Sequence, residues 1–412
     1  MKLGLAAIDA LCERLGRPER ATPAVLVAGT NGKGSVAAAL SSIAKAAGVR
    51  AGLYTSPHLN RVGERIRIGE VDLSDEDLDA VLEPVFRAAD HAPEIPATYF
   101  EALTAAAFVA FDKWRLELAI LEVGLGGRFD ATNIAPAIFS IVTSIGLDHV
   151  EELGTTMDAI AREKAGVFRA ARPALIGPCD EDAGRALAEA ARETGAVLHD
   201  AVEEIALSDI RVSLAGTRFG LATPGRRYSI DMPLPGAHQA ANAALAARAA
   251  ELLESDFPVL DAAAIQRGIA ATRWPGRLEK LSVRDRVVLL DGCHNPQGAR
   301  ALAQFLQDCG LSGRARLVFG AMADKDVELM AHLLFPAAAS IRLVAAPSPR
   351  GATLAELVRR TAAMRMDAIP SESLEAALAD LLRESDPAPI IVAGSLYLVG
   401  EARSLLLSGR LE

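Results

Sequence analysis

This chain has few cysteines, few aromatic residues and no excess of basic charge, and each shortage excludes a class of protein. Its 412 residues carry a formal net charge of −10, whereas a general nucleic-acid-binding protein needs a basic surface to contact phosphates. Aromatic residues make up 4% of the chain, too few for base-stacking platforms. The four cysteines, Cys12, Cys179, Cys293 and Cys309, form no CxxC pair. This pattern argues against a zinc site or a disulfide framework and indicates a reducing compartment.

Long apolar runs are missing as well. No stretch approaches the roughly 20 residues of a membrane-spanning helix. Asp9 interrupts the apolar run of residues 1–16, so this segment fits an amphipathic helix better than a signal peptide. We therefore expect a cytoplasmic protein that binds neither membranes nor nucleic acid. We also expect a monomer, which these observations do not themselves determine.

Apolar, β-branched runs alternate with helical segments through the first half of the chain. Strands are expected within residues 22–30, 50–56, 116–124 and 137–146, and a further helix at about 181–194. Such βαβ alternation predicts a parallel sheet covered by helices.

The pattern changes near residue 205. Residues 205–232 alternate in short polar and apolar steps with turn glycines, which predicts hairpins. Residues 272–279, rich in Pro, Gly and Arg, are typical of a hinge, and a second α/β series follows them. We expect an α/β protein with two domains, at residues 1–279 and 280–412. The first would hold a P-loop-type parallel sheet sandwiched by helices, and the second a smaller Rossmann-like domain.

A glycine-rich loop lies between the first expected strand and the helix after it, as a phosphate-binding loop requires. It consists of Gly29, Thr30, Asn31, Gly32, Lys33, Gly34 and Ser35. Its spacing differs from G-x-x-x-x-G-K-[ST], because two residues separate the first glycines and Gly34 follows Lys33. The glycines let backbone N–H groups approach an anion, and Lys33 supplies a charge for phosphates. Thr30, Ser35 or both could hold phosphate or a metal. The alternative is an ordinary glycine turn with a surface lysine.

A second glycine-rich stretch, LEVGLGGRFDATN at residues 121–133, invites comparison with a dinucleotide-binding loop. That interpretation fails because Phe129 occupies the third glycine position of G-x-G-x-x-G. Together with YTSPHLNRVGERIRI (54–68), TSIGLDHVEELG (143–154) and AREKAGVF (161–168), it resembles folylpolyglutamate synthase and dihydrofolate synthase, in the Mur ligase superfamily. The phosphate loop has the same family form, with glycine between lysine and serine, and LLDGCHNPQGA, GAMADKD and GSLYLVGE continue the likeness in the second half.

The resemblance implies a site for ATP and Mg²⁺. By family position, ATP binds the phosphate loop, Asn242, Arg277 and Asp291, and the metal ligands are Ser56, Glu122 and His149. A carboxylate suits Mg²⁺, whereas imidazole is an unusual ligand for it. The implied catalytic residues are Lys33, Lys164 and His149, with Lys164 carbamylated. The residues alone would favour an ordinary surface pair of Glu163 and Lys164.

The resemblance also implies a substrate-binding set, which falls in five segments of the chain. Its members are Lys2, Leu3, Gly4, Leu5, Thr98, Tyr99, Phe100, Glu101, Phe129, Asp130, Ala131, His294, Ser395 and Tyr397. Leucine is commoner in the family than phenylalanine at position 129.

The expected function is that of an ATP-dependent ligase that works through an acyl phosphate. It would add L-glutamate to dihydropteroate, forming dihydrofolate, and to tetrahydrofolate, forming polyglutamates. One alternative is a monofunctional folylpolyglutamate synthase. A cell-wall Mur ligase is less favoured, because the phosphate-loop strand begins near residue 23 with no UDP-binding domain before it. A nucleotide-binding switch is disfavoured by the many carboxylates and histidines in the motifs.

Overall fold

The computed structural model describes residues 4–364 and 368–411. The chain forms two compact units that interleave in sequence. The first contains Met1–Asp209, Phe219–Ile230 and Ala241–Thr272, and the second contains Ile210–Arg218, Asp231–Ala240 and Arg273–Glu412.

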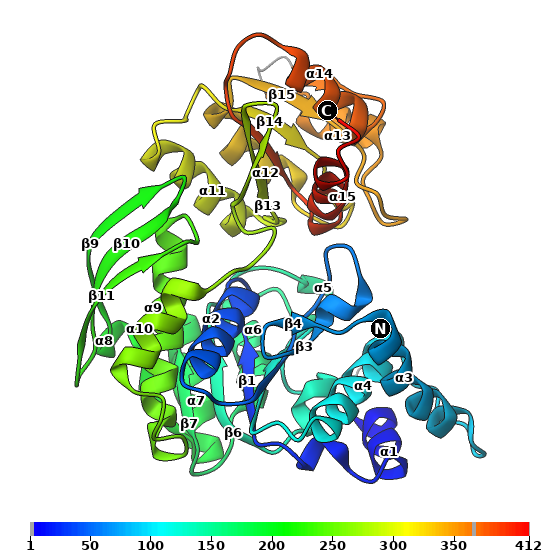
Figure 1. Cartoon of the computed structure of the whole chain (residues 1–412), viewed down its shortest axis with the longest axis vertical. Coiled ribbons are helices and arrows are strands. Elements are labelled where there is room, and N and C mark those ends of the chain that lie inside the picture. Colours follow the sequence, from blue (N-terminus) through cyan, green and yellow to red (C-terminus); the bar gives the residue numbers. More distant parts are fainter. Residues whose placement is uncertain (1–3, 365–367, 412) are drawn as a thin grey trace. The chain divides into compact units, whose positions relative to one another are not determined.

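The first unit is built on an eight-stranded sheet with the order β4-β3-β2-β5-β1-β6-β7-β8 (Figure 1). Its strands are β1 (Ala24–Ala28), β2 (Ala51–Tyr54), β3 (Ile66–Ile68), β4 (Val71–Asp72), β5 (Leu118–Glu122), β6 (Ala137–Val142), β7 (Pro173–Ile176) and β8 (Val197–Asp200). In this order, the neighbouring strands β2, β5, β1, β6, β7 and β8 all pair parallel. At the other edge, β3 pairs antiparallel with β2, and β4 pairs antiparallel with β3. Every residue of β1 and β5 is buried, as the apolar run of β1 and the apolar residues 118–121 of β5 predict for strands covered on both faces.

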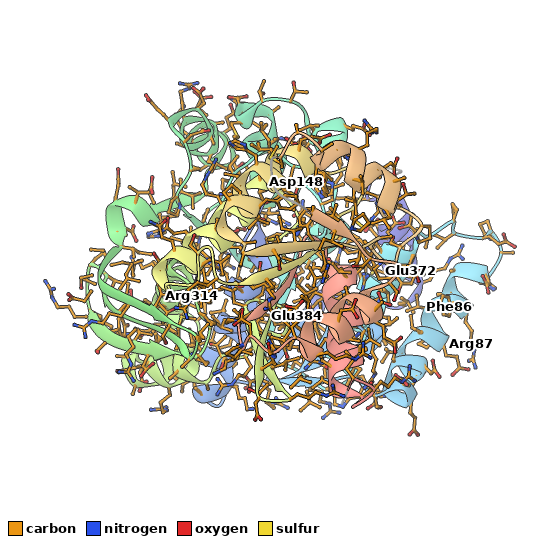
Figure 2. All side chains as sticks on the ribbon, turned by 90° about the horizontal axis from the view of Figure 1, so that it is seen from above. Phe86, Arg87, Asp148, Arg314, Glu372 and Glu384 are labelled. Carbon is orange, nitrogen blue, oxygen red and sulfur yellow. The ribbon has the colours of Figure 1, made fainter. Side chains whose placement is uncertain are left out.

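Helices connect these strands. They are α1 (Ala6–Arg14), α2 (Lys33–Ala46), α3 (Asp75–Asp90), α4 (Tyr99–Lys113), α5 (Val150–Leu153), α6 (Met157–Lys164), α7 (Glu181–Thr194), α8 (Ala201–Glu204), α9 (Ala237–Leu252) and α10 (Ala262–Ala271). The helix expected at 181–194 is confirmed as α7. Helices α2 and α10 pack together at Gly268, where any β-carbon would overlap the backbone of Ile43. By contrast, α3 presents Phe86, which is 53% exposed, and the neighbouring Arg87 to solvent (Figure 2).

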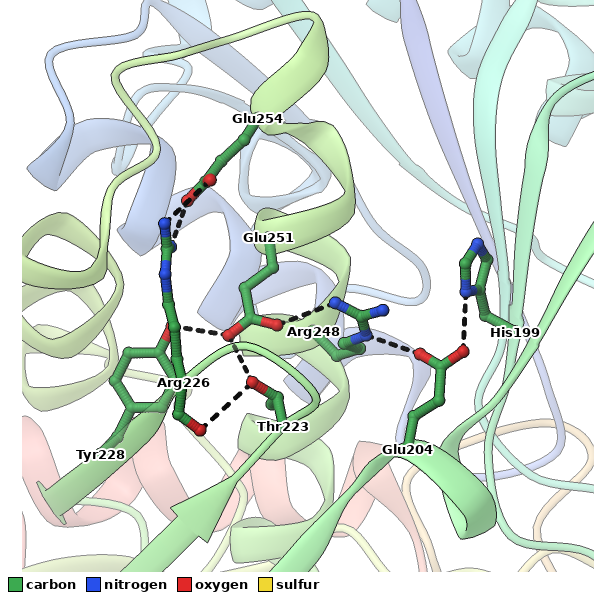
Figure 3. A network of polar contacts seen from close by, with 8 residues as sticks. All are labelled: His199, Glu204, Thr223, Arg226, Tyr228, Arg248, Glu251 and Glu254. Carbon is green, nitrogen blue, oxygen red and sulfur yellow. Dashed lines mark hydrogen bonds and ion pairs between the residues drawn. The ribbon is translucent and has the colours of Figure 1, made fainter.

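The short strands expected over residues 205–232 are confirmed as β9 (Ala206–Ser213), β10 (Gly216–Ala222) and β11 (Arg227–Met232), which form a three-stranded sheet. A half-buried polar network ties the turn between β10 and β11 to α9 (Figure 3). Glu251 is its centre, accepting hydrogen bonds from Thr223 (2.8 Å), Tyr228 (2.7 Å) and Arg248 (3.0 Å). Arg248 also donates to Glu204 at 2.6 Å, which extends the network to α8. These charge-assisted bonds fix the strands against the helix.

The second unit contains a six-stranded sheet with the order β12-β13-β17-β14-β15-β16. The strands are β12 (Glu279–Val283), β13 (Arg286–Asp291), β14 (Arg316–Phe319), β15 (Ser340–Leu343), β16 (Ala368–Pro370) and β17 (Ile390–Ala393). Strand β12 pairs antiparallel with β13, and the other described strand pairs of this sheet are parallel. The helices are α11 (Pro296–Asp308), α12 (Val327–Leu334), α13 (Leu354–Thr361), α14 (Leu374–Arg383) and α15 (Leu396–Leu407). The expected α/β class, with a second, smaller α/β domain, is confirmed. No helix in the described part of the chain is long and apolar enough to cross a membrane.

Candidate active site

The motifs of the first unit meet at one edge of its sheet. Strands β2, β5, β1 and β6 are neighbours and run parallel, so their carboxyl ends lie side by side. Residues 55–58, 122–130, 29–35 and 143–149 follow these four ends in turn. Ligands of open parallel sheets bind at this edge, which makes it the candidate active site.

The phosphate loop follows β1 and leads directly into α2. Gly32 has a left-handed backbone (φ 84°) and precedes the first helical residue, Lys33. The Lys33 ammonium donates to the carbonyls of Gly29 (3.0 Å) and Thr30 (3.1 Å). The helix N-terminus and the lysine therefore place positive charge at the same loop, as binding of a phosphate group requires.

The segment after β6 holds the phosphate loop in place. The Thr30 hydroxyl donates to the carbonyl of Gly146 (3.1 Å) and accepts from its N–H (3.0 Å). Thr143 and Ser144 both donate to the carbonyl of Asn31, at 2.6 and 3.1 Å. The Thr30 side chain therefore helps to hold the loop in shape, and its role as a phosphate or metal ligand stays a prediction. Sequence reasoning missed Thr143 and Ser144, whose only signal was a pair of hydroxyl residues at a strand end.

At two positions of the loop, neighbouring atoms lie so close that only glycine fits. At Gly29, which has φ 145°, any β-carbon would overlap the Thr143 hydroxyl. At Gly32, a β-carbon would lie 2.5 Å from the amide oxygen of Asn242 on α9. The structure therefore places Asn242, a predicted ATP contact, directly against the phosphate loop. Ser35 is buried in the first turn of α2.

Lys164 ends α6 and is 4% exposed, so the interpretation as an ordinary surface pair with Glu163 is wrong. Its ammonium donates to the carbonyl of Gly29 at 2.8 Å, while Glu163 instead lies 3.4 Å from Arg128. Burial and then the charge of Lys33 lower the pKa of Lys164 to about 7 from an ordinary 10.5. A lysine in this state is largely neutral and nucleophilic just above neutral pH.

Two of the predicted metal ligands are brought together. The backbone N–H of Ser56 donates to the Glu122 carboxylate at 3.1 Å, and Glu122 is 6% exposed at the end of β5. His149 has a left-handed backbone (φ 52°) and a half-exposed ring, 3.9 Å from Asp148. Within residues 4–364 and 368–411, no three His, Cys, Asp or Glu side chains cluster as a metal-binding group. A hydroxyl and one carboxylate beside a phosphate loop nevertheless fit Mg²⁺, which takes few protein ligands and completes its shell with phosphate oxygens and water.

The glycine turn after β5 is organised by Asp130. One carboxylate oxygen accepts from the N–H groups of Gly124 and Leu125, both at 3.0 Å. The other accepts from the N–H (3.0 Å) and hydroxyl (2.6 Å) of Thr132. Burial raises the pKa of Asp130, and these hydrogen bonds oppose that rise. Because a carboxylate has about four acceptor positions, the protein itself already fills those of Asp130.

The remaining predicted substrate residues of the first unit divide by exposure. Thr98 and Glu101 form a capping box at the start of α4, so their polar groups serve the helix end. Phe100 packs against the glycine turn, where a β-carbon on Gly124 would lie 2.6 Å from its ring. Tyr99 and Phe129 are 60% and 45% exposed and are available to a ligand. Ala131 is buried, and Leu5 packs on the core.

The N-terminal members of the substrate set are only partly described. Gly4 is exposed and has φ 153°. Lys2 and Leu3 lie outside the described residues.

In the second unit, the predicted residues gather at the carboxyl ends of β13 and β17, which are adjacent and parallel. Asp291 accepts from the N–H groups of Leu278 (3.1 Å) and Cys293 (3.0 Å). A β-carbon at Gly292 would overlap the Arg277 guanidinium, which places Arg277 at this edge. His294 hydrogen-bonds the Gly292 carbonyl through Nδ1 at 2.9 Å.

Ser395 and Tyr397 lie at the beginning of α15. The buried Ser395 hydroxyl accepts from the N–H of Tyr397 at 3.2 Å and caps the helix, whereas Tyr397 is 37% exposed. Of these two residues, Tyr397 has the more accessible side chain.

Comparison with known proteins agrees with this geometry. Residues 27–250 match the Mur ligase middle domain and residues 276–396 match the Mur ligase glutamate ligase domain. The chain belongs to the Mur ligase family. Within it, the chain is 33% identical over 408 residues to the folylpolyglutamate synthase of Lacticaseibacillus casei, covering 97% of this chain and 94% of the relative. It is 35% identical over 404 residues to the Escherichia coli dihydrofolate synthase/folylpolyglutamate synthase, covering 98% and 91%.

Solved structures of this Mur ligase branch have the same fold. Folylpolyglutamate synthase of Mycobacterium tuberculosis complexed with ADP superimposes with a TM-score of 0.90 at 33% identity, covering 98% of this chain and 94% of that one. The Escherichia coli enzyme in complex with DHPP and ADP gives 0.87 at 32% identity, covering 100% and 94%. The family assignment made from the motifs is thereby confirmed, as are an ATP-dependent ligase activity and the use of ATP with a divalent metal.

Proposed function

We propose that this protein is an ATP-dependent ligase that adds L-glutamate to dihydropteroate, forming dihydrofolate, and to tetrahydrofolate, forming polyglutamates. The observation that carries the proposal is the meeting of the phosphate loop, Lys164 and the Ser56–Glu122 pair at one sheet edge. Relatives over nearly the full chain carry this pair of activities in their names.

The chemistry requires activation of a carboxylate, because a free carboxylate is a poor electrophile. ATP transfers its γ-phosphoryl group to the acid substrate, and the glutamate amine displaces phosphate from the acyl phosphate. The loop amides and Lys33 hold the phosphates and offset their charge, which is the main catalytic task in phosphoryl transfer. Ser56, Glu122 and His149 are the proposed metal ligands. Magnesium, when bound, neutralises the phosphate oxygens and polarises the phosphoryl group.

Lys164 is proposed to act as a carbamate. Its neutral amine would attack carbon dioxide through the nitrogen lone pair and release a proton to solvent. The product is an anion with two oxygens that can orient the metal or its water. Support comes from its 4% exposure and from the low pKa that burial imposes.

The two reactions differ in where the reacting carboxylate lies, on the pteroyl group or on an attached glutamate. Both would use the exposed Tyr99 and Phe129 beside the glycine turn. On the second unit, His294 and Tyr397 are proposed to bind glutamate, and Arg277 and Asp291 to contact ATP. We further propose that residues 1–279 and 280–412 are the functional domains and that the protein works as a monomer in the cytoplasm.

The test is mass spectrometry of products formed from ATP, L-glutamate and either dihydropteroate or tetrahydrofolate, with ADP release measured in parallel. Dihydrofolate and extended tetrahydrofolate are both expected, with ADP release that depends on acid and glutamate together. Extension of tetrahydrofolate alone would establish the monofunctional alternative. ADP release that needs neither folate acid would refute the assignment.

A further inference from the structure

Arg65 lies at the candidate active site, although it is not among the residues for which the sequence motifs predict a role. It ends the short 3₁₀ turn Val62–Arg65 and directly precedes β3. Its carbonyl accepts from the N–H of Thr55 at 2.9 Å. Because β3 runs antiparallel to β2, the start of β3 adjoins the carboxyl end of β2, next to Ser56.

Arg65 is a buried residue whose guanidinium has no counter-ion among the described residues. The residue is 8% exposed, and its Nε donates to Nδ1 of His58 at 2.9 Å. Its guanidinium carbon lies 5.4 Å from the centre of the Tyr99 ring. Within the described part of the chain, no carboxylate forms an ion pair with it. The adjacent Glu64 instead accepts from backbone N–H groups of residues 59–61.

His58 does not neutralise this charge. A histidine ring carries no negative charge, and its Nδ1 serves here only as the acceptor of the Arg65 Nε–H hydrogen bond. One of the five guanidinium N–H donors is thereby used. A buried cation costs stability unless it is paired, and the other donors form a fork that matches a carboxylate.

Nearby arginines behave differently. Arg67, two residues along β3, lies 2.6 Å from Asp72, and Arg61 lies 3.1 Å from Asp75. Strand β4 and helix α3 therefore supply acidic partners to Arg67 and Arg61, and no described carboxylate is supplied to Arg65. Such an arrangement suits a partner that arrives with the substrate.

The position of Tyr99 indicates which chemical group accompanies the carboxylate in that ligand. Its exposed ring begins α4, and the next residue, Phe100, packs on the glycine turn after β5. An exposed aromatic face beneath a guanidinium suits a ligand with an aryl group next to its carboxylate.

We propose that Arg65 binds a carboxylate of the folate-type acid, with the aryl part of that acid on Tyr99. The inference rests on the proposed function and identifies the side chain that recognises the acid group. The carboxylate could be the single one of a pteroate or one on the glutamate of a folate, and the ligand series below separates these sources.

The experiment measures calorimetric affinities of pteroate and its neutral carboxamide for the wild type, Arg65→Gln, Arg65→Lys and Arg61→Gln. Arg61→Gln is the matched control, because it removes the same charge from the same loop at an ion-paired position. The wild type should prefer the acid over the amide by roughly 10- to 100-fold, since hydrogen bonds to charged groups contribute about 1.5–3 kcal/mol. Arg65→Gln should abolish the preference, Arg65→Lys should retain part of it, and Arg61→Gln should keep it whole.

An unchanged acid-to-amide ratio in Arg65→Gln overturns the inference, even if both affinities fall. If that variant does not fold, Arg65→Lys decides, because a full preference there means that the fork is not used. Pteroylglutamate and its α- and γ-monoamides, measured in the same way, show which carboxylate Arg65 contacts. A wild type that binds neither pteroate nor pteroylglutamate refutes the proposed function itself, whereas binding with a preference independent of Arg65 refutes only this inference.

Discussion

Replacing Lys164 by methionine should make this enzyme more stable at neutral pH while it loses activity. Burial lowers the pKa of Lys164 to about 7, whereas the unfolded chain has the ordinary 10.5. Between these values the unfolded state binds more protons, so the lysine makes stability rise with pH. At pH 7 and below, the full penalty applies, and it corresponds to about 5 kcal/mol because each pKa unit is worth about 1.4 kcal/mol.

Methionine fills a similar volume without the charge, but it gives up the hydrogen bond to Gly29, worth about 1 kcal/mol. The net gain for Lys164→Met should therefore be on the order of 3–4 kcal/mol at pH 7 and should shrink toward pH 10.

Urea unfolding of both proteins from pH 7 to pH 9.5 measures this difference, in carbon-dioxide-free buffer so that no carbamate forms. Lys45→Met is the control, since it removes a lysine that is 59% exposed and paired with Glu70 instead of a buried one. A stability difference that stays constant with pH, or a variant less stable than the wild type at pH 7, would refute the reasoning. The activity lost in Lys164→Ala should return in part with added small carboxylic acids if the lysine is carbamylated.

Three further outcomes follow from the site and the fold. Lys33→Ala should lower kcat by about 10²–10³ with an unchanged melting temperature, and a near-normal rate would remove the loop from the mechanism. Asp130→Asn should reduce activity with dihydropteroate and tetrahydrofolate alike, because it disrupts the hydrogen bonds that shape the glycine turn; loss with only one acid would indicate direct substrate contact. Burial would raise the pKa of Glu204, but hydrogen bonds from Arg248 and His199 outweigh it and lower that pKa. Its stabilising effect should therefore hold at neutral pH and disappear as pH falls through the lowered value, so acid titration of the melting temperature should be steeper for the wild type than for Glu204→Gln.

Much of the fold could be predicted from local sequence. The buried strand β1 and residues 118–121 of the buried strand β5 are continuous apolar runs, and the helix at 181–194 is amphipathic with an N-capping aspartate. The phosphate loop was recognisable because glycine spacing and the adjoining strand and helix act over a few residues. The order of motifs along the chain was sufficient to assign the family.

The burial and charge pairing of the side chains in the site depend on contacts between distant parts of the chain, which cannot be recognised in the sequence. Lys164 is buried because it reaches Gly29, 135 positions away in the chain, and no local pattern separates it from an exposed lysine. Asp130 was predicted from its motif as a substrate contact, and only the structure shows the four hydrogen bonds by which it also holds the glycine turn. Arg65 stands between ion-paired arginines in sequence, and only the packing of β2, β3 and α4 leaves it buried beside a tyrosine. Local hydrogen bonding and periodicity act between near neighbours and can be inferred from sequence, whereas burial and charge pairing depend on residues that only the folded chain brings together.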